Sequence, residues 1–255
     1  FILWISLREV IYMGSTFERN HKVAYGETSK NGEVFVSEIV NYMVETSINH
    51  GENLGIGVDY QKSKGEAWIL YRWDITFNEM PRFYEDLKVT TECMGANKFY
   101  AYRKFNIYRN EQCLIDAKSQ WVYLDFNKRK VKRITEKDIE KFDVKGKETL
   151  SFDKLLKEKE EITSRLFTVR YRDIDMNEHV NNTKYVCWAI ESIDHEFLIN
   201  HKIKNLKVIY KKETTYKDVV TSKVYSTKED NVLLHKIYSS EGVELAVLQS
   251  TWDAR

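Results

Sequence analysis

Two stretches of the chain place apolar side chains three and four residues apart, which is the spacing of an amphipathic helix. Residues 37–51 carry such a stripe, formed by Val40, Met43, Val44 and Ile48. Ser37 is a suitable N-cap for this helix and Gly51 a suitable end. Residues 181–197 repeat the spacing with Val186, Ala189, Ile190, Ile193 and Phe197. We therefore predict two helices, each with one apolar face.

The segments that follow each predicted helix alternate between apolar and polar residues, as expected of half-buried strands. The first helix precedes four such segments, at residues 67–77, 87–95, 98–109 and 113–125. The second precedes another four, at residues 206–213, 218–229, 231–240 and 243–254. Short polar turns join them, so the strands should be antiparallel. The predicted class is α+β, with one central helix and one antiparallel sheet in each half.

The two halves also share residues at a nearly constant offset. Tyr84 and Asp86 match Tyr216 and Asp218, which lie 132 residues further on. Ser119 and Trp121 match Ser250 and Trp252, which lie 131 residues further on. Two matched pairs at nearly equal spacing indicate a duplicated unit.

The duplication suggests the limits of the domains. We expect an N-terminal unit at residues 17–126 and a C-terminal unit at residues 161–255, joined by a charged linker at residues 127–160. The core of this linker is poor in apolar residues, which favours a linker or a surface helix. Residues 1–16 are interpreted as an N-terminal extension that is either vector-derived or upstream sequence.

Composition narrows the class of protein. The chain has 40 basic and 39 acidic side chains, a balance that argues against a nucleic-acid binder. Its three cysteines are far apart and odd in number, which is typical of a reduced protein without a disulfide framework. The apolar N-terminus is too short to span a bilayer and lacks the pattern of a signal peptide. We therefore expect a cytoplasmic protein with no membrane partner.

The stretch "YRDIDMNEHVNNTKY", residues 171–185, concentrates polar side chains and has several interpretations. The first is a calcium loop, because Asp173, Asp175 and Asn177 fit the opening of an EF-hand. Glu178 then stands where the loop needs glycine, and Lys184 where it needs a bidentate glutamate. The calcium interpretation fails, and we expect no metal.

Two further interpretations concern Asn181 and Asn182. With Thr183 they form a glycosylation acceptor, which has no meaning in a chain without a secretion signal. Either asparagine could instead cap the helix that follows. A cap explains one asparagine, but it requires neither Asp175 nor His179.

The chemical interpretation uses Asp175, Asn177 and His179 together. A histidine can transfer a proton near neutral pH, an amide can orient a carbonyl or a water, and a carboxylate can act as base or nucleophile. In an extended segment the three side chains would share one face. The N-terminus of the following helix would offer backbone N–H groups to a developing oxyanion. This pattern is typical of an acyl-transfer site.

Two motifs of the second unit carry a resemblance to a known family. "DIDMNEHVNNTKYVCWAIES" resembles the helix-entry motif of acyl-acyl-carrier-protein (acyl-ACP) thioesterases, and "LKVIYKKET" resembles their next strand. In the first unit, "VNYMVETSINHGENLG" and "WDITFNEMPRFYEDLKVTTECMG" look like the N-terminal half of that family. The resemblance covers roughly residues 17–255. It implies a double hotdog fold, in which each of two long helices is wrapped by an antiparallel sheet.

The resemblance also implies the catalytic residues, which are Asp175, Asn177, His179 and Glu213. Plant members carry cysteine directly after that glutamate, whereas this chain has Thr214. We therefore expect no thiol to take part in the chemistry. The helix entry of the first unit, "NGEVFVSEIVNY", has no D-x-N-x-H motif, so we expect a single active site in the second unit.

The implied activity is hydrolysis of fatty acyl-ACP to a free fatty acid and ACP, without a cofactor. The alternatives are an acyl-CoA thioesterase of the same fold and a non-catalytic acyl-binding protein. The partner would be acidic acyl carrier protein, and a basic cluster could bind it, formed by Lys128, Arg129, Lys130, Lys132 and Arg133. The acyl pocket is predicted at Met43, Val44, Trp68 and Ile69. A homodimer is left open.

Overall fold

The computed structural model describes residues 16–144 and 148–255, so the predicted N-terminal extension lies outside the described residues except for Thr16. The strands are β1 (Thr16–Lys22), β2 (Glu66–Phe77), β3 (Asp86–Ala96), β4 (Ala101–Arg109), β5 (Gln112–Asp125), β6 (Lys130–Val131), β7 (Glu161–Thr168), β8 (His201–Tyr210), β9 (Val219–Tyr225), β10 (Val232–Tyr238) and β11 (Glu244–Ala254). The helices are α1 (Val36–Asn53), α2 (Val58–Lys64), α3 (Glu136–Ile139), α4 (Asn182–Glu191) and α5 (His195–Asn200). Three 3₁₀ turns complete the set, η1 (Tyr25–Glu27), η2 (Glu140–Phe142) and η3 (Tyr171–Asp173). The predicted α+β class is confirmed.

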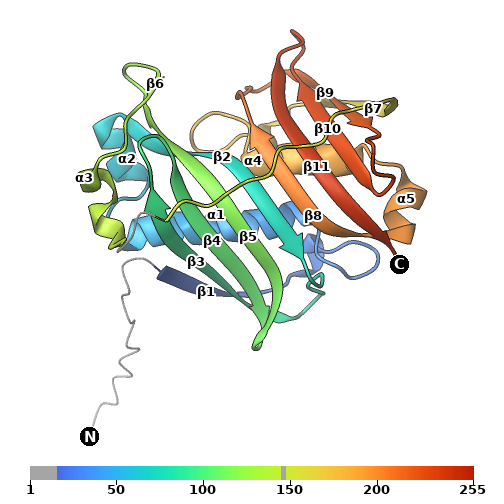
Figure 1. Ribbon diagram of the computed structural model, residues 1–255, viewed down its shortest axis with the longest axis horizontal. Coiled ribbons are helices and arrows are strands. Elements are labelled where there is room, and N and C mark those ends of the chain that lie inside the picture. Colours follow the sequence, from blue (N-terminus) through green and yellow to red (C-terminus); the bar gives the residue numbers. More distant parts are fainter. Residues whose placement is uncertain (1–15, 145–147) are drawn as a thin grey trace, which may run out of the picture.

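One curved antiparallel sheet runs through both halves of the protein (Figure 1). Its strands follow the order β1-β3-β4-β5-β2-β8-β11-β10-β9-β7, with β6 paired to β5. The two halves meet where β2 pairs with β8, from Arg72 opposite Ile209 to Thr76 opposite Asn205. All eight strands predicted from alternation are present, whereas the edge strands β1 and β7 were not predicted.

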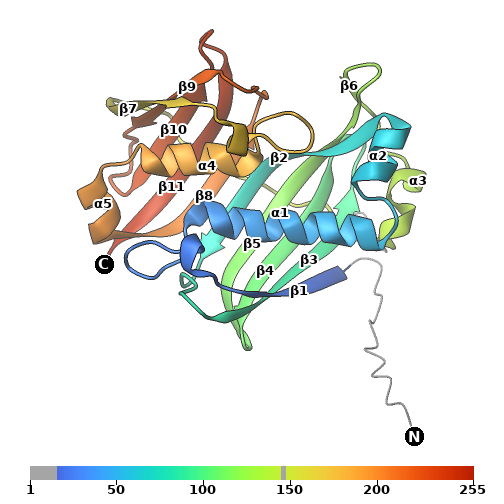
Figure 2. The same ribbon diagram turned by 180° about the vertical axis from the view of Figure 1, so that it is seen from behind.

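The two long helices lie side by side on one face of the sheet (Figure 2). Val40 and Met43 of α1 and Val186 and Ala189 of α4 are completely buried in the core between helices and sheet. Ile48 was predicted to belong to the apolar stripe of α1, but its side chain is 44% exposed. None of the helices in the described part of the chain is long and apolar enough to cross a bilayer.

The predicted helix limits need two corrections. Helix α1 begins one residue before Ser37, and its N-cap is Phe35, which makes no capping hydrogen bond with its side chain. The second helix does not continue to residue 197, because α4 ends at Glu191. A second cap, Asp194, then starts α5 by accepting hydrogen bonds from the backbone of the first turn.

The duplication is visible in matching hydrogen bonds. In the first unit the Trp121 indole N–H donates to the hydroxyl of buried Ser119 at 2.7 Å. In the second unit the Trp252 indole donates to buried Ser250 at 2.8 Å. These two matches, found at an offset of 131 residues, are therefore structurally equivalent.

The other proposed match is wrong by one residue. The backbone N–H of Tyr84 donates to Val23 O, and the equivalent bond in the second unit runs from Lys217 to Val169 O. Both donors have the same left-handed backbone, with φ of 68° and 70°. Tyr84 is thus equivalent to Lys217 rather than to Tyr216, because the turn geometry, and not the residue type, was retained.

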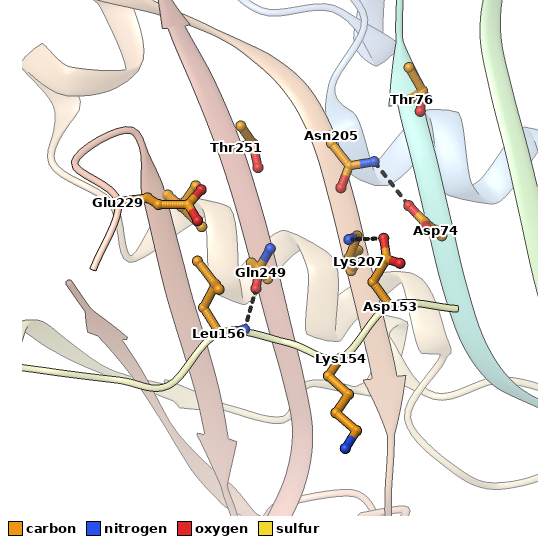
Figure 3. A pocket seen from close by; sticks show the side chains of 11 residues that line it. Asp74, Thr76, Asp153, Lys154, Leu156, Asn205, Lys207, Glu229, Gln249 and Thr251 are labelled. Carbon is orange, nitrogen blue, oxygen red and sulfur yellow. Dashed lines mark hydrogen bonds and ion pairs between the residues drawn. The ribbon is translucent and has the colours of Figure 1, made fainter. Parts of the chain in front are cut away.

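Residues 148–160, the segment that joins the two units, cross the face of the sheet opposite the long helices (Figure 1). The carboxylate of Asp153 pairs with Lys207 at 2.9 Å, and its carbonyl accepts a hydrogen bond from Arg72. Further along, the Leu156 N–H donates to the Gln249 side chain at 2.7 Å. Asp153, Leu156, Lys207 and Gln249 are among the residues that line a polar hollow under the segment (Figure 3). The segment therefore ties both units together from outside.

Stability should depend on pH through His235, which is fully buried in β10. Its Nε2 lies 2.8 Å from the Ser250 hydroxyl. Burial lowers the pKa of His235 from 6.5 to about 3, against an opposite effect of the Ala189 backbone. Between about pH 3 and pH 6.5, His235 therefore binds a proton in the unfolded chain but not in the native chain. The contribution of His235 to the free energy of unfolding should be fully present above about pH 6.5. It should fall on acidification by up to about 1.4 kcal/mol per pH unit.

Urea unfolding of the wild type and of His235→Gln at pH 7 and pH 5 measures this effect. The variant should be less stable at pH 7, but its loss of stability on going to pH 5 should be smaller by about 2 kcal/mol. An equal loss in both proteins would show that His235 is not the group responsible.

Candidate active site

The predicted catalytic motif forms a tight loop at residues 174–180, closed by a bridge between Ile174 and Val180. The Asp175 N–H donates to His179 O at 2.9 Å, and the Glu178 N–H donates to Asp175 O at 3.1 Å. Glu178 has a left-handed φ of 65°, which reverses the chain. The expectation of an extended segment is therefore wrong, because the backbone folds into a turn.

Within this loop, the Asp175 carboxylate accepts a hydrogen bond from the Asn177 backbone N–H at 2.8 Å. This bond fixes the carboxylate over the turn and leaves its second oxygen available. The Asn177 side chain is exposed, and no described residue forms a hydrogen bond with its amide. It is therefore oriented by the backbone alone and can contact a ligand in front of the loop.

The structure brings His179 and Glu213 together, although they lie on different segments. His179 Nε2 is 3.3 Å from Glu213 Oε2, and their side chains are 38% and 53% exposed. A backbone hydrogen bond, from Val180 N–H to Thr214 O at 3.0 Å, holds the loop against the segment that follows β8. The contact pairs an imidazole with a carboxylate, and both side chains remain partly open to solvent.

The N-terminus of α4 begins directly after the loop. Asn181 caps the helix as predicted, because its side-chain oxygen accepts the Thr183 N–H at 2.9 Å. The Lys184 N–H is also bonded, to Asn181 O at 2.9 Å. The cap thus occupies groups that we expected to be free for an oxyanion. Among the first three N–H groups of α4, that of Asn182 has no partner in the described chain.

Asp173, a buried residue directly before the loop, was not identified from the sequence as part of the site. Its side chain is completely buried and accepts hydrogen bonds from the backbone and guanidinium of Arg170. Burial alone would raise the pKa of Asp173, but the hydrogen bonds and charge of Arg170 hold it below its ordinary value. Arg170 and Asp173 have the three-residue spacing of a cap, which is the signal that could have identified them.

No thiol lies in the site. The Thr214 hydroxyl, at the position of the plant cysteine, donates to the Asp218 carboxylate at 2.5 Å and anchors the turn before β9. Cys187 is half-buried in α4, and burial raises the pKa of its thiol. Cys93 is buried in β3, where burial has the same effect. The expectation that the carboxylates and His179 carry the chemistry stays a prediction.

The first unit contains a loop with the same backbone pattern as residues 174–180, although it lacks the D-x-N-x-H motif. Residues 28–34 are closed by a bridge between Thr28 and Val34, equivalent to the bridge between residues 174 and 180. The Ser29 N–H donates to Glu33 O at 2.8 Å, and the Asn31 N–H lies 3.3 Å from the Ser29 hydroxyl. Ser29, Asn31 and Glu33 thus occupy the positions of the three motif residues.

The side chains of this counterpart differ from those of the predicted catalytic motif. Glu33 is held by two hydrogen bonds from Arg255, at 2.9 and 2.5 Å, and lies 3.7 Å from Arg82. The Val34 N–H donates to Pro81 O, as Val180 does to Thr214 O, so Met80 stands at the position of Glu213. The equivalence of residues 28–34 and 174–180 cannot be recognised from the sequence motif, because the two loops share their backbone but not their side chains.

The predicted pocket residues do not form one group. Met43 is completely buried, and Val44 packs against the same core. Trp68 stacks on Tyr123 and packs against a second, smaller cluster of buried residues under α2. Ile69 is the next residue of β2 and belongs to neither cluster, because neighbouring residues of a strand face opposite sides.

The predicted basic cluster lies at the tip of the β5–β6 hairpin. Lys132 is paired with Glu66 and Asp138, at 2.9 and 3.1 Å. Lys128 is paired with Asp125 at 3.0 Å. The remaining members are exposed and form no ion pair among the described residues; they are Arg129, Lys130 and Arg133.

Family comparisons match nearly the whole chain. The family model for the acyl-ACP thioesterase N-terminal domain matches residues 14–142, and that for the C-terminal domain matches residues 156–254. The chain is similar to a chloroplastic oleoyl-acyl carrier protein thioesterase of Coriandrum sativum, with 25% identity over 98% of this chain and 74% of the relative. It is also 25% identical to a chloroplastic palmitoyl-acyl carrier protein thioesterase of Gossypium hirsutum, over 96% of this chain and 65% of the relative.

Solved structures share the fold. A putative oleoyl thioesterase from Lactobacillus plantarum superposes with a TM-score of 0.87 at 21% identity, covering 94% of this chain and 96% of the other. The 12:0-ACP thioesterase from Umbellularia californica gives a TM-score of 0.83 at 19% identity, covering 94% and 98%. The fold is the double hotdog that the sequence resemblance implied. With both of its halves matched by family models, the chain belongs to the acyl-ACP thioesterase family.

Proposed function

We propose that this protein hydrolyses fatty acyl-ACP thioesters, releasing a free fatty acid and the thiol of ACP. The observation that supports this most directly is the contact of 3.3 Å between His179 and Glu213 beside the Asp175–Asn177 turn. The pair joins an imidazole to a carboxylate, and the neighbouring turn carries an amide and a second carboxylate. Groups of these kinds can activate water, orient a carbonyl and protonate a leaving thiolate, which supports the proposal.

The proposed mechanism assigns one role to each group. A carboxylate, Glu213 or Asp175, takes a proton from a water molecule while the oxygen of that water attacks the thioester carbonyl. The Asn177 amide orients the carbonyl or the water, and the Asn182 N–H stabilises the oxyanion. When the C–S bond breaks, His179 protonates the departing thiolate. An alternative first step is direct attack by the carboxylate, which gives an anhydride that water then hydrolyses.

The products also suggest a biological role. Release of the free acid ends the elongation of an acyl chain on its carrier, so we propose that the enzyme terminates fatty acid synthesis. We propose a cytoplasmic location, supported by three cysteines that remain unpaired; the plant relatives named above are chloroplastic. Fractionation of the source cells, followed by immunoblotting, would test this location.

Alanine variants test the catalytic residues. Asp175→Ala, His179→Ala and Glu213→Ala should each lower kcat for acyl-ACP about a hundredfold or more, the usual effect of losing an acid–base or nucleophilic group. Asn177→Ala should act similarly, since a donor aimed at the transition state is worth roughly 3 kcal/mol. Release of ACP thiol, followed with purified protein, provides the measurement. As a control, Cys187→Ala should reduce stability more than kcat.

The same assay separates the alternatives. A chain that prefers acyl-CoA over acyl-ACP would be an acyl-CoA thioesterase, and a chain that binds acyl-ACP without turnover would be a binding protein. Loss of activity on alkylation of one cysteine, together with an active Glu213→Ala variant, would establish a thiol mechanism instead.

We also propose that ACP docks beside the tip of the β5–β6 hairpin. The hairpin joins α2 through a hydrogen bond from Phe126 N–H to Gly65 O at 2.9 Å. Helix α2 in turn contacts the catalytic loop, because Lys62 Nζ lies 3.3 Å from Met176 O. The exposed cations of the tip are thus linked to the active site by two successive contacts, and they complement an acidic carrier.

Charge reversal tests this surface. The triple variant Arg129→Glu, Lys130→Glu and Arg133→Glu should raise KM for acyl-ACP severalfold and flatten its dependence on salt, because the attraction between enzyme and carrier is lost. Turnover of small acyl thioesters should not change. The matched control replaces three exposed lysines of the joining segment, Lys154, Lys157 and Lys159, by glutamate. Equal effects of both triple variants would exclude the hairpin as the docking site.

We propose that the apolar face of α1 and Trp68 line the acyl pocket. Met43 and Val44 of the first unit pack in the core cluster that both units share, and Trp68 packs against the second, smaller cluster of the first unit. A chain that starts at the catalytic loop could extend into this unit. The first unit would then determine chain length, which gives a function to a catalytically silent copy.

Val44→Phe tests the pocket, because Val44 is only partly buried and can be enlarged with little strain. We expect a shift of the products towards shorter acids, since an overfilled pocket rejects terminal methylenes at roughly 1 kcal/mol or more each. Ile48→Phe, one turn further on and exposed, is the matched control and should leave the profile unchanged. Gas chromatography of the released acids gives the profile, and an unchanged profile for Val44→Phe would place the pocket elsewhere.

A further inference from the structure

Tyr185 of α4 has a buried hydroxyl that donates a hydrogen bond to no described residue. Its side chain is 2% exposed, and the hydroxyl forms no hydrogen bond of normal geometry with the described residues. Its ring packs edge-on against Trp188 and Tyr210. Tyr210, by contrast, donates its hydroxyl to Asn182 O at 3.2 Å. Burying an unpaired hydroxyl is unfavourable, so a phenylalanine would pack better at position 185 unless the hydroxyl has a function.

Two of the proposed catalytic carboxylates, Glu213 and Asp175, act on this hydroxyl through their charge. Burial raises the pKa of Tyr185, and the negative charges of Glu213, Asp218 and Asp175 raise it further, whereas the nearby Thr214 backbone acts in the opposite direction. The hydroxyl is therefore protonated at neutral pH and available as a donor. The Thr214 backbone can act as a donor to this oxygen, which leaves the O–H of Tyr185 free to donate to a carboxylate.

The first unit provides an internal comparison, because the helix entries of both units can be superimposed bond by bond. Phe35 N–H donates to Glu27 O, and Asn181 N–H donates to Asp173 O, both at 2.9 Å. Three turns later, Thr46 donates to Tyr42 O and Ser192 donates to Trp188 O, at 2.6 and 2.7 Å. The difference in residue number between matched residues is the same at both ends of the two helices, so Ile39 is the equivalent of Tyr185.

Ile39 is completely buried, so an apolar side chain satisfies the packing at this position of the fold. In the first unit, isoleucine at this position accompanies Met80, the equivalent of Glu213. In the second unit, tyrosine accompanies the glutamate. The hydroxyl and the carboxylate are thus present together in one unit and absent together in the other, which indicates that they act together.

We propose that Tyr185 is a positioning residue whose hydroxyl donates a hydrogen bond to the Glu213 carboxylate when the acyl thioester is bound, holding this carboxylate against His179. The inference rests on the proposed thioesterase function. Bound substrate displaces water from the half-exposed carboxylate, and a neighbouring donor then becomes more valuable because the site is less polar. Without substrate, the Glu213 side chain is about half exposed, and the Tyr185 hydroxyl donates to no described residue.

The test is Tyr185→Phe in the full chain, which removes one oxygen atom and keeps the ring. We expect kcat for acyl-ACP to fall about tenfold or more, with KM changed less than about twofold. The acidic limb of the kcat–pH profile should move to higher pH, because a carboxylate that loses a donor takes up a proton more readily. The thermal midpoint should stay the same or rise, because no hydrogen bond of the free protein is lost.

Tyr42→Phe is the matched control, because Tyr42 is a buried tyrosine of the silent unit whose hydroxyl donates to Glu27 at 2.8 Å. It should lower the thermal midpoint and leave kcat and the pH profile unchanged. A further variant tests the partner: adding Tyr185→Phe to Glu213→Gln should lower kcat less than about twofold beyond Glu213→Gln alone.

The outcomes distinguish the two proposals. If the wild type hydrolyses acyl-ACP and Tyr185→Phe keeps its kcat and pH profile, Tyr185 has no positioning role and the proposed function stands. A full tenfold loss in the Glu213→Gln background would also contradict the pairing of Tyr185 with Glu213. If the wild type hydrolyses no acyl thioester, the proposed function fails and this inference fails with it.

Discussion

Five residues of β2 pair with five of β8, and this junction makes one sheet from two. The strand order that results brings the inner faces of both units to the same side, so that α1 and α4 pack against each other. It also brings α2, at the far end of the first unit, to the catalytic loop of the second, where Lys62 contacts Met176 O. The proposed active site therefore contacts both units, although all four of its proposed catalytic residues belong to the second. The outer segment reinforces the junction by bonding Arg72 on β2 and Lys207 on β8 through Asp153.

The two units retained their backbones more faithfully than their side chains. Gly32 in the first loop and Glu178 in the second both adopt a left-handed φ, of 72° and 65°. Glycine takes this conformation without strain, whereas a glutamate does so at a cost of order 1 kcal/mol or more. The strained residue belongs to the unit with the proposed chemistry, next to His179. In the silent unit, the position of the histidine is filled by Glu33, and Arg255 neutralises it.

Alternation and helical spacing were sufficient to predict the central strands and both long helices, because these elements bury one face against a common core. The edge strands β1 and β7 were missed, because most of their side chains are exposed or half-buried and the apolar signal is weak. The N-cap Asn181 was predictable from local chemistry. The contact between His179 and Glu213 was implied only by family resemblance, because residues on separate segments meet through tertiary folding. The counterpart loop at residues 28–34 was invisible, since its evidence lies in backbone hydrogen bonds.

A kinetic double-mutant cycle between His179 and Glu213 tests the central claim, that these two residues form one catalytic unit. kcat for acyl-ACP would be measured for the wild type, His179→Ala, Glu213→Ala and the double variant. If the residues act together, the double variant should lose no more than about threefold beyond the worse single variant, because the first substitution already disables the unit. If the two losses multiply, the residues contribute independently, and the contact of 3.3 Å between them is not the basis of catalysis.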